Sequence, residues 1–272
     1  MAVPASITAA AHQAWVEPLA RAGFAARGLV YLLIGGFAVL AAFDRSDVKG
    51  SEGALTTILS QPFGKVLLWL AIIGLVGFAL WRFLQAWLDT DNAGSGARGL
   101  LLRVGQAGSG VVHLGLAFLA ARLALGWGSG GGDPSGRWIA AAYQAGYGRW
   151  LTWAVAAIVL VVAGAHIWNG WQARFARFFR ACPPEIMRWL RPLAQFGYIA
   201  RGVTFAVIAS LIFYGGLNYG GAEGATPGLA DALRAVQGYT LGWLILLVIA
   251  LGLVAFGLYS LAAARYRRIR VS

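Results

Sequence analysis

The chain is poor in charged residues and in side chains that bind metals. Only 12% of its 272 residues are charged and 59% are hydrophobic, whereas soluble domains have about 25% charged residues. This composition excludes an ordinary water-soluble domain and indicates a protein whose solvent is lipid. The single cysteine, Cys182, excludes an intramolecular disulfide. The three histidines (His12, His113 and His166) are too far apart in sequence to form a metal-ligand cluster, so we predict no metal and no cofactor.

Catalytic patterns are also missing. No nucleophile is followed by a base and an acid at a plausible membrane depth, so we predict that the protein is not an enzyme. No aspartate or glutamate lies well inside a hydrophobic stretch. Proton-coupled transporters relay protons through buried carboxylates, so this absence argues against that class.

Six hydrophobic stretches are long enough to cross a bilayer, which takes roughly 20 apolar residues of helix. They are Phe24–Phe43, Val66–Leu88, Val104–Gly126, Trp150–Gln172, Gly197–Leu217 and Thr240–Ala262. No remaining segment is long enough for a second, soluble domain. We therefore predict one all-α membrane domain over residues 1–272.

The lysines and arginines between these stretches predict the orientation. Twelve lie on the side that holds both termini and seven on the opposite side. Basic residues concentrate in cytoplasmic loops, so we expect both termini in the cytoplasm. The net charge of +12 follows from this bias and from attraction to anionic lipid headgroups. No compact basic module is present, so we predict no nucleic-acid partner.

An internal repeat organises the chain. The segment Ala20–Tyr31 returns at Ala194–Phe205, and a more divergent copy lies at Leu102–His113. Each copy opens the first of two hydrophobic stretches, which predicts three units of two helices, over residues 15–92, 98–180 and 188–272. An even number of spans makes every unit enter the membrane in the same direction. Three such units predict a pseudo-threefold six-helix bundle.

Aligning the three segments places similar residues four positions apart, on one face of each first helix. This stripe holds a small residue first and a ring at mid-depth; its candidate members are Gly23, Tyr31, Gly105, Ser109, His113, Gly197 and Phe205. Small residues let helices approach closely in lipid, so the stripe fits a tight helix seam. The alternative is a stripe that faces a central cavity or a partner.

Three arginines lie inside the hydrophobic stretches: Arg27, Arg82 and Arg201. Arg27 and Arg201 are expected about one turn inside the cytoplasmic ends of their helices, with Arg82 approaching the same level. Arginines there can extend to lipid phosphates, and their planar fork suits a carboxylate or a phosphate. We treat them as candidates for binding an anion or a headgroup. Their other candidate partners are Glu17, Asp89 and Glu185.

The block Ala22–Tyr31, its return at Gly197–Phe205 and the two-helix period resemble a bacterial membrane family, the domain of unknown function 1206 family. The resemblance covers essentially the whole chain. It implies three tandem two-helix units in a bacterial cytoplasmic (inner) membrane and implies no activity. The second unit departs from the pattern, with Ser109 in place of arginine and His113 at the ring position.

Packing seams and headgroup anchors are the main features of the sequence, so a non-enzymatic membrane interaction or scaffold protein fits it best. Its expected partners are a bilayer with anionic headgroups and, in addition, another membrane protein. The alternative is a channel or transporter for a small solute or anion, with an arginine-lined cytoplasmic mouth. A polar cavity that reaches Tyr31 and His113 would favour this alternative, and dry packing of both would count against it.

Overall fold

The computed structural model describes residues 5–44, 51–60, 62–91, 94–127, 141–179, 182–218, 233–234, 238 and 240–269. Within these ranges the regular structure is helical, and six helices are long and apolar enough to cross a membrane. They are α1 (Ala5–Asp44), α3 (Gly64–Leu88), α4 (Ala97–Leu125), α6 (Gly148–Trp171), α7 (Pro184–Asn218) and α9 (Gly242–Tyr266). The prediction of an all-α membrane protein with six spanning helices is confirmed.

The first helices of units one and three begin earlier than their hydrophobic stretches. Helix α1 starts at Ala5 and α7 at Pro184, so Arg27 and Arg201 lie several turns inside their helices. The expectation that they lie one turn from a helix end is wrong. The physical reason is that the apolar face continues past the hydrophobic stretch: Ala194, for example, is fully buried.

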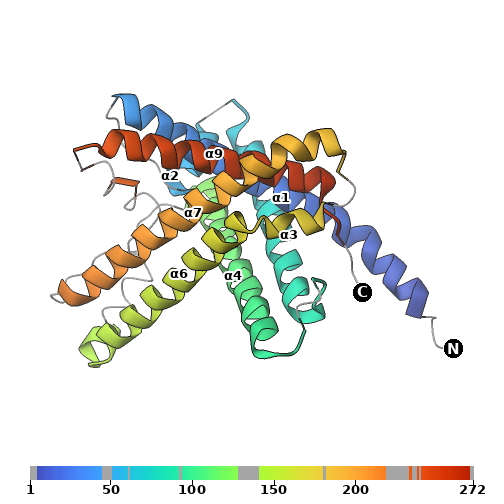
Figure 1. The fold of residues 1–272 in the computed structure, drawn as a ribbon, viewed down its shortest axis with the longest axis horizontal. Helices are drawn as coiled ribbons and strands as arrows, with labels where there is room; N and C mark the ends of the chain where they lie inside the picture. The colour runs from blue at the N-terminus through green and yellow to red at the C-terminus, as the bar shows by residue number, and fades with distance from the viewer. Residues whose placement is uncertain are drawn as a thin grey trace.

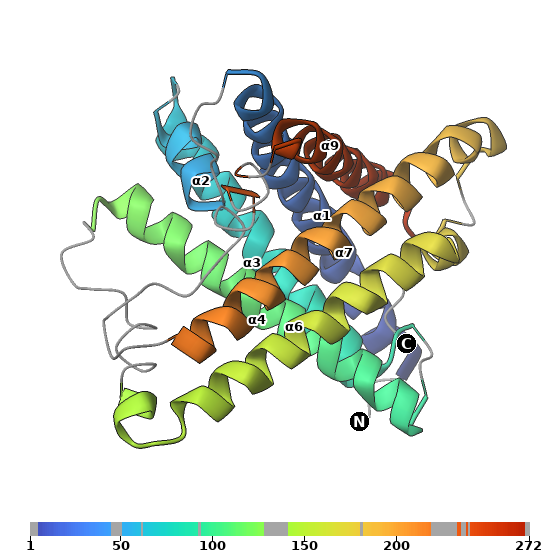
Figure 2. The same ribbon diagram turned by 60° about the vertical axis from the view of Figure 1, so that its left-hand side comes forward.

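The six helices pack as an open ring. Each helix contacts its neighbours in the order α4, α3, α1, α9, α7 and α6. The pairs α1/α9, α3/α4 and α6/α7 run side by side and diverge from a common crossing region (Figures 1 and 2). Closing the ring would require α4 to pack along α6, and these two helices barely touch. The ring is therefore open inside unit two.

The three contacts between successive units have the same kind of packing. In each, a glycine of a first helix abuts an apolar side chain of the preceding unit's second helix, and a β-carbon added to the glycine would overlap that side chain. The pairs are Gly28 with Leu261, Gly110 with Phe83 and Gly202 with Ile167. These are the between-unit seams. All three are closed, as a pseudo-threefold arrangement requires.

The contacts within units are not equivalent. Gly23 abuts Phe78 in unit one and Gly197 abuts Phe256 in unit three, again without room for a β-carbon. Gly105 holds the same place in unit two, and a β-carbon there would meet nothing within 4 Å. We call the three places where the two helices of one unit face each other the within-unit seams. The seam of unit two, at Gly105, is the open seam.

Burial follows the same division. The most apolar windows of α4 and α6 are 28% and 11% buried, whereas those of the other four helices are 39–56% buried. Unit two therefore presents much of its surface to the membrane.

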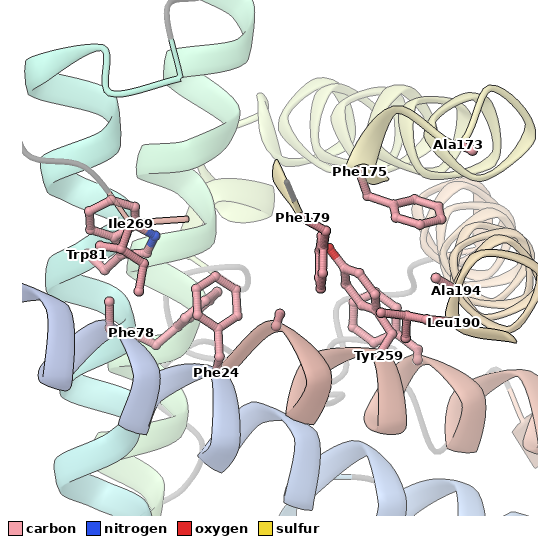
Figure 3. Packing of buried hydrophobic residues seen from close by; sticks show 13 residues of the cluster. Phe24, Phe78, Trp81, Ala173, Phe175, Phe179, Leu190, Ala194, Tyr259 and Ile269 are labelled. Atoms are coloured by element: carbon pink, nitrogen blue, oxygen red, sulfur yellow. The ribbon is translucent and has the colours of Figure 1, made fainter. Parts of the chain in front are cut away.

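The largest buried hydrophobic cluster of the described residues includes Ile269, just after α9, and we call this side of the bundle the termini side. There, aromatic side chains from α1, α3, α9 and the short helix η1 (Arg174–Phe178) form one buried cluster (Figure 3). Phe175 of η1 stacks on Tyr198, with ring centroids 5.4 Å apart. The backbone N–H of Arg268 donates to the Phe178 carbonyl at 2.9 Å. The link between units two and three thus fastens the end of α9.

Short helices support the opposite side of the bundle. Helix α2 (Ser51–Leu59) buries Leu55 and Ile58 in a cluster that includes Leu68 of α3 and Ala120 of α4. Leu233, in the corresponding segment of unit three, is fully buried in a cluster of α1 and α9 residues.

Candidate central cavity

A cavity of about 190 Å³ lies where the first helices of the three units converge. Its lining includes polar and aromatic residues of α1, α4 and α7: Arg27, Tyr31, His113, Arg201, Thr204 and Phe205. The middle part of the predicted stripe thus faces a cavity, and the cavity reaches both Tyr31 and His113. The glycines at the start of the stripe do not line it.

Arg27 lies against aromatic rings instead of extending to the end of its helix. Its guanidinium carbon is 5.0 Å from the ring centroid of Phe24, 4.7 Å from that of Phe78 and 5.1 Å from that of Phe256. Its Nε donates to the Ser260 hydroxyl at 3.2 Å. Aromatic faces attract cations, so these rings hold the charge beside the cavity.

Arg201 has an equivalent position in unit three. Its guanidinium lies 4.6 Å from the ring of Phe256 and 5.0 Å from those of Tyr31 and Phe205. Phe256 therefore lies in contact distance of both guanidiniums. Arg201 Nε is buried without a hydrogen-bond partner. In the described part of the chain, neither Arg27 nor Arg201 forms an ion pair with a carboxylate.

The ring positions of the stripe make similar contacts in the three units; two partners, Phe256 and Phe78, are equivalent in the repeat, and the third, His166, lies one turn further along its helix. Each ring meets an aromatic or imidazole ring of the preceding unit's second helix. The pairs and centroid distances are Tyr31 with Phe256 at 4.9 Å, His113 with Phe78 at 4.5 Å and Phe205 with His166 at 5.3 Å. His166 therefore packs against Phe205 and Tyr198 of α7.

His113 is 4% exposed and contributes to the cavity wall. Its Nδ1 lies 2.7 Å from the backbone carbonyl oxygen of Ser109. A carbonyl can only accept, so Nδ1 carries the proton. That bond is the only hydrogen bond of the ring within the described ranges. Nε2 consequently has no protein partner there.

The remaining candidates lie away from the cavity. Gly23 and Gly197 fill the closed within-unit seams, and Gly105 borders the open seam. Arg82 donates to Gln85 Oε1 at 3.0 Å and is not among the lining residues. Of the three candidate arginines, the fold brings together only Arg27 and Arg201.

A polar cluster on the termini side was not predicted. Asp91 Oδ2 accepts from Gln85 Nε2 at 3.1 Å and from Gln106 Nε2 at 3.0 Å. Its other oxygen lies 3.6 Å from a guanidinium nitrogen of Arg267. The cluster joins all three units. Gln85 and Asp91 belong to unit one, Gln106 belongs to α4 of unit two, and Arg267 follows α9 of unit three. Gln85 near the end of α3 and Gln106 inside α4 were the available signal, but nothing in their spacing indicates a shared carboxylate.

A family model described as Domain of Unknown Function (DUF1206) matches residues 22–89, 104–173 and 196–267 of this chain. The chain belongs to the DUF1206 family. Each match begins two residues into one copy of the repeated segment. A relative from Bacillus subtilis (strain 168), Uncharacterized protein YxxB, is 30% identical over 257 residues, covering 94% of this chain and 92% of the relative. No solved structure matches significantly.

The cavity of this DUF1206 protein is suited to binding a ligand through its arginine side chains. Among the described residues, no three His, Cys, Asp or Glu side chains gather as a metal site. Cys182 lies outside the spanning helices, and burial raises the pKa of its thiol, which makes it a poor nucleophile. The cavity instead offers two guanidiniums and one imidazole nitrogen to a ligand.

Proposed function

We propose that this protein is a non-enzymatic membrane binding protein whose central cavity holds an anionic group between Arg27 and Arg201. The observation that carries the proposal is the convergence of two guanidiniums from equivalent helices on one cavity, without a carboxylate partner among the described residues. Charges inside a membrane protein are costly and mark functional positions by default. An anion would supply the missing counter-charge.

The contacts of the two arginines favour a ligand over a purely structural role. Arginines outside the cavity donate to oxygens of the protein: Arg103 donates to the carbonyls of Ala86 and Trp87 at 2.6 and 3.0 Å, and Arg82 donates to Gln85, although Arg82 Nε is also buried without a partner. Arg27 makes one hydrogen bond to a hydroxyl, and Arg201 is held mainly by rings. Aromatic faces orient a guanidinium without using its N–H donors, so those donors remain available for an anion.

The size of the cavity limits what it can hold. Pockets for drug-sized ligands measure roughly 300–1,000 Å³, and this cavity measures about 190 Å³. It has room for a small anion or for the charged head of a larger molecule. In the cell, we place this site in a bacterial cytoplasmic membrane with both termini in the cytoplasm.

The anion channel remains the alternative: the cavity reaches Tyr31 and His113, which supports it, but most of the cavity wall is apolar, which counts against it. A channel also needs a route past the termini side, where the Asp91 cluster ties three units together by hydrogen bonds. We therefore favour binding without conduction. A scaffold role is compatible with binding, since an occupied cavity would stabilise the open bundle.

The test is anion binding by the purified protein in mild detergent. Arg27→Gln/Arg201→Gln is compared with wild type and with Arg188→Gln/Arg191→Gln, which removes the same charge from exposed positions on α7. We expect phosphate or phosphate-bearing lipids to raise the Tm of wild type and of the control, and not that of the cavity variant. Equal Tm shifts in all three proteins would refute the site.

Anion flux into liposomes separates the two candidates. Background flux for wild type, together with the Tm shift, supports binding alone. Wild-type flux that disappears in the cavity variant would replace the binding proposal by the channel.

A further inference from the structure

The cavity has an open side that leads toward the membrane. Its lining residues come from α1, α3, α4, α7 and α9, and α6 contributes none. Val112 of α4 is 61% exposed and yet lines the cavity. Since α4 and α6 barely touch, we take the exposed part of the cavity wall at Val112 to open sideways between α4 and the α6/α7 pair.

The gap is a consequence of the open seam. In units one and three, Phe78 and Phe256 wedge against the glycine of the first helix. Val162 is at the equivalent place in unit two, since His166 aligns with Arg82. Gly105 and Gly108 on the facing helix have open space around them. The apolar surface along the gap suits hydrocarbon chains.

The cavity offers a hydrogen-bond acceptor besides its two cations. His113 donates from Nδ1 to Ser109, so in the neutral ring Nε2 is an acceptor with a free lone pair. A buried imidazole among apolar side chains is ordinarily neutral. A ligand that satisfies the whole cavity must therefore bear a negative charge for Arg27 and Arg201 and a hydrogen-bond donor for His113.

A phosphate monoester in its singly protonated form has both properties. Its charged oxygens suit the planar fork of arginine, and its remaining hydroxyl can donate. A carboxylate lacks the donor, and a protonated carboxylic acid lacks the charge.

We infer that the cavity binds the phosphate monoester head of a lipid that enters sideways between α4 and α6, with its acyl chains lying in the gap. This inference rests on the anion site proposed above and adds the ligand class and the route. The head fits a cavity of about 190 Å³, and the chains remain in the membrane.

Native mass spectrometry of the full-length protein can measure lipid binding directly. The probes are phosphatidic acid, a monoester, and phosphatidylmethanol, which has the same chains and tetrahedral anion but no donor. At about pH 5.5, below the second phosphate pKa of about 6, both carry one charge. We expect phosphatidic acid to bind about tenfold more tightly, as one additional hydrogen bond to a charged group allows.

Substitution of His113 tests the acceptor. His113→Phe keeps a ring beside Phe78 and removes Nε2, so the preference for phosphatidic acid should fall to about onefold. His113→Gln supplies an amide oxygen and should restore part of the preference. If wild type shows no preference, or if His113→Phe retains it, the monoester assignment is wrong. Loss of binding in Arg27→Gln/Arg201→Gln would still support the anion site in either case.

The sideways route has a matched pair of variants. Val111 and Val112 are both 61% exposed, and only Val112 lines the cavity. We expect Val112→Trp to weaken phosphatidic acid binding about tenfold or more and Val111→Trp to leave it unchanged. Equal effects of the two variants would overturn the route.

Soluble phosphates distinguish the source of the head group. Glycerol 3-phosphate and inorganic phosphate should bind at least about tenfold more weakly than phosphatidic acid, because they lack chains to fill the gap. Equally tight binding of glycerol 3-phosphate would overturn the lipid assignment and leave the anion site standing. If wild type does not distinguish phosphatidic acid from zwitterionic phosphatidylcholine, both this inference and the anion site fail.

Discussion

The between-unit seams and the within-unit seams of this bundle are built from the same repeated helices but have different outcomes. All three between-unit seams are closed by a glycine against an apolar side chain. Two within-unit seams are closed in a similar way, and the third, in unit two, is open. The repeat therefore keeps the contacts that join units and gives up one contact inside a unit.

The difference between the seams shows which residues are needed to close a within-unit seam. Unit two keeps the seam glycine, Gly105, and has Gly108 where the other units have alanine, but it lacks the large ring opposite them. Close approach in lipid needs both the small residue and the partner that packs on it, since dispersion drives the association. A glycine alone makes a seam possible without making it form.

The largest difference in stability is expected between truncations at a closed and at the open within-unit seam. Phe256→Ala removes a fully buried ring that packs on Tyr31, Tyr198 and both cavity arginines. We expect a loss of about 3 kcal/mol in the free energy of unfolding, the lower end for buried phenylalanines, because lipid reduces the transfer contribution. Val162→Ala, at the open seam, should cost less than about 1 kcal/mol. Chemical denaturation in detergent measures both, and similar losses would contradict the comparison.

The Asp91 cluster is the next test, because it ties unit two to the others where the seam is open. Asp91→Ala leaves the amides of Gln85 and Gln106 and the charge of Arg267 without their acceptor. We expect about 2–3 kcal/mol of destabilisation. Asp91→Asn retains an acceptor oxygen and should cost about half as much. If both variants unfold like wild type, the cluster does not hold the units together.

Adding a methyl group probes the seams more gently. Gly197→Ala places a β-carbon against the backbone of Phe256, so we expect about 1–3 kcal/mol of destabilisation by overpacking. Gly105→Ala meets open space and should be neutral or up to about 1 kcal/mol stabilising through helix propensity. Melting temperatures in detergent compare the two, and a Gly105→Ala protein that melts well below wild type would mean that this seam closes in solution.

The smallest effect on stability is expected from cysteines at equivalent seam positions. Gly108 and Ala200 correspond in the repeat, and Ala200 is 5% exposed whereas Gly108 is exposed. In a Cys182→Ser background, Gly108→Cys should react rapidly with a membrane-permeant maleimide and Ala200→Cys slowly. Equal labelling rates would show that the seam of unit three opens as readily as that of unit two.

Most of the architecture was predictable from the sequence. Hydrophobic length predicts the six spans, and the return of Ala20–Tyr31 at Ala194–Phe205 predicts the units, because both are local properties of the chain. The i+4 stripe also placed Arg27, Tyr31, His113 and Arg201 on one face. The structure then shows that its glycine end forms seams and its middle lines a cavity.

The partners of these residues could not be predicted. Phe256 comes 55 positions after Arg201 and more than 200 after Arg27, and only the packing of α9 against both α1 and α7 brings them together. Asp91 and Arg267 meet for the same reason. The depth of Arg27 was misjudged because hydropathy ends at Phe24 while the helix continues to Ala5. Hydropathy reports the lipid-facing composition and not the length of the helix.

The covalent linkage of the three units has a consequence for how such a bundle can change. In a homotrimer of two-helix subunits, every substitution would appear three times, so opening one seam would open all three and the assembly would fall apart. A single polypeptide lets one copy diverge while the other two keep their within-unit seams closed and hold the bundle together. Val162, Ser109 and His113 occur once each at their places in this chain. Tandem fusion thus turns a symmetric ring into one with a defined entrance.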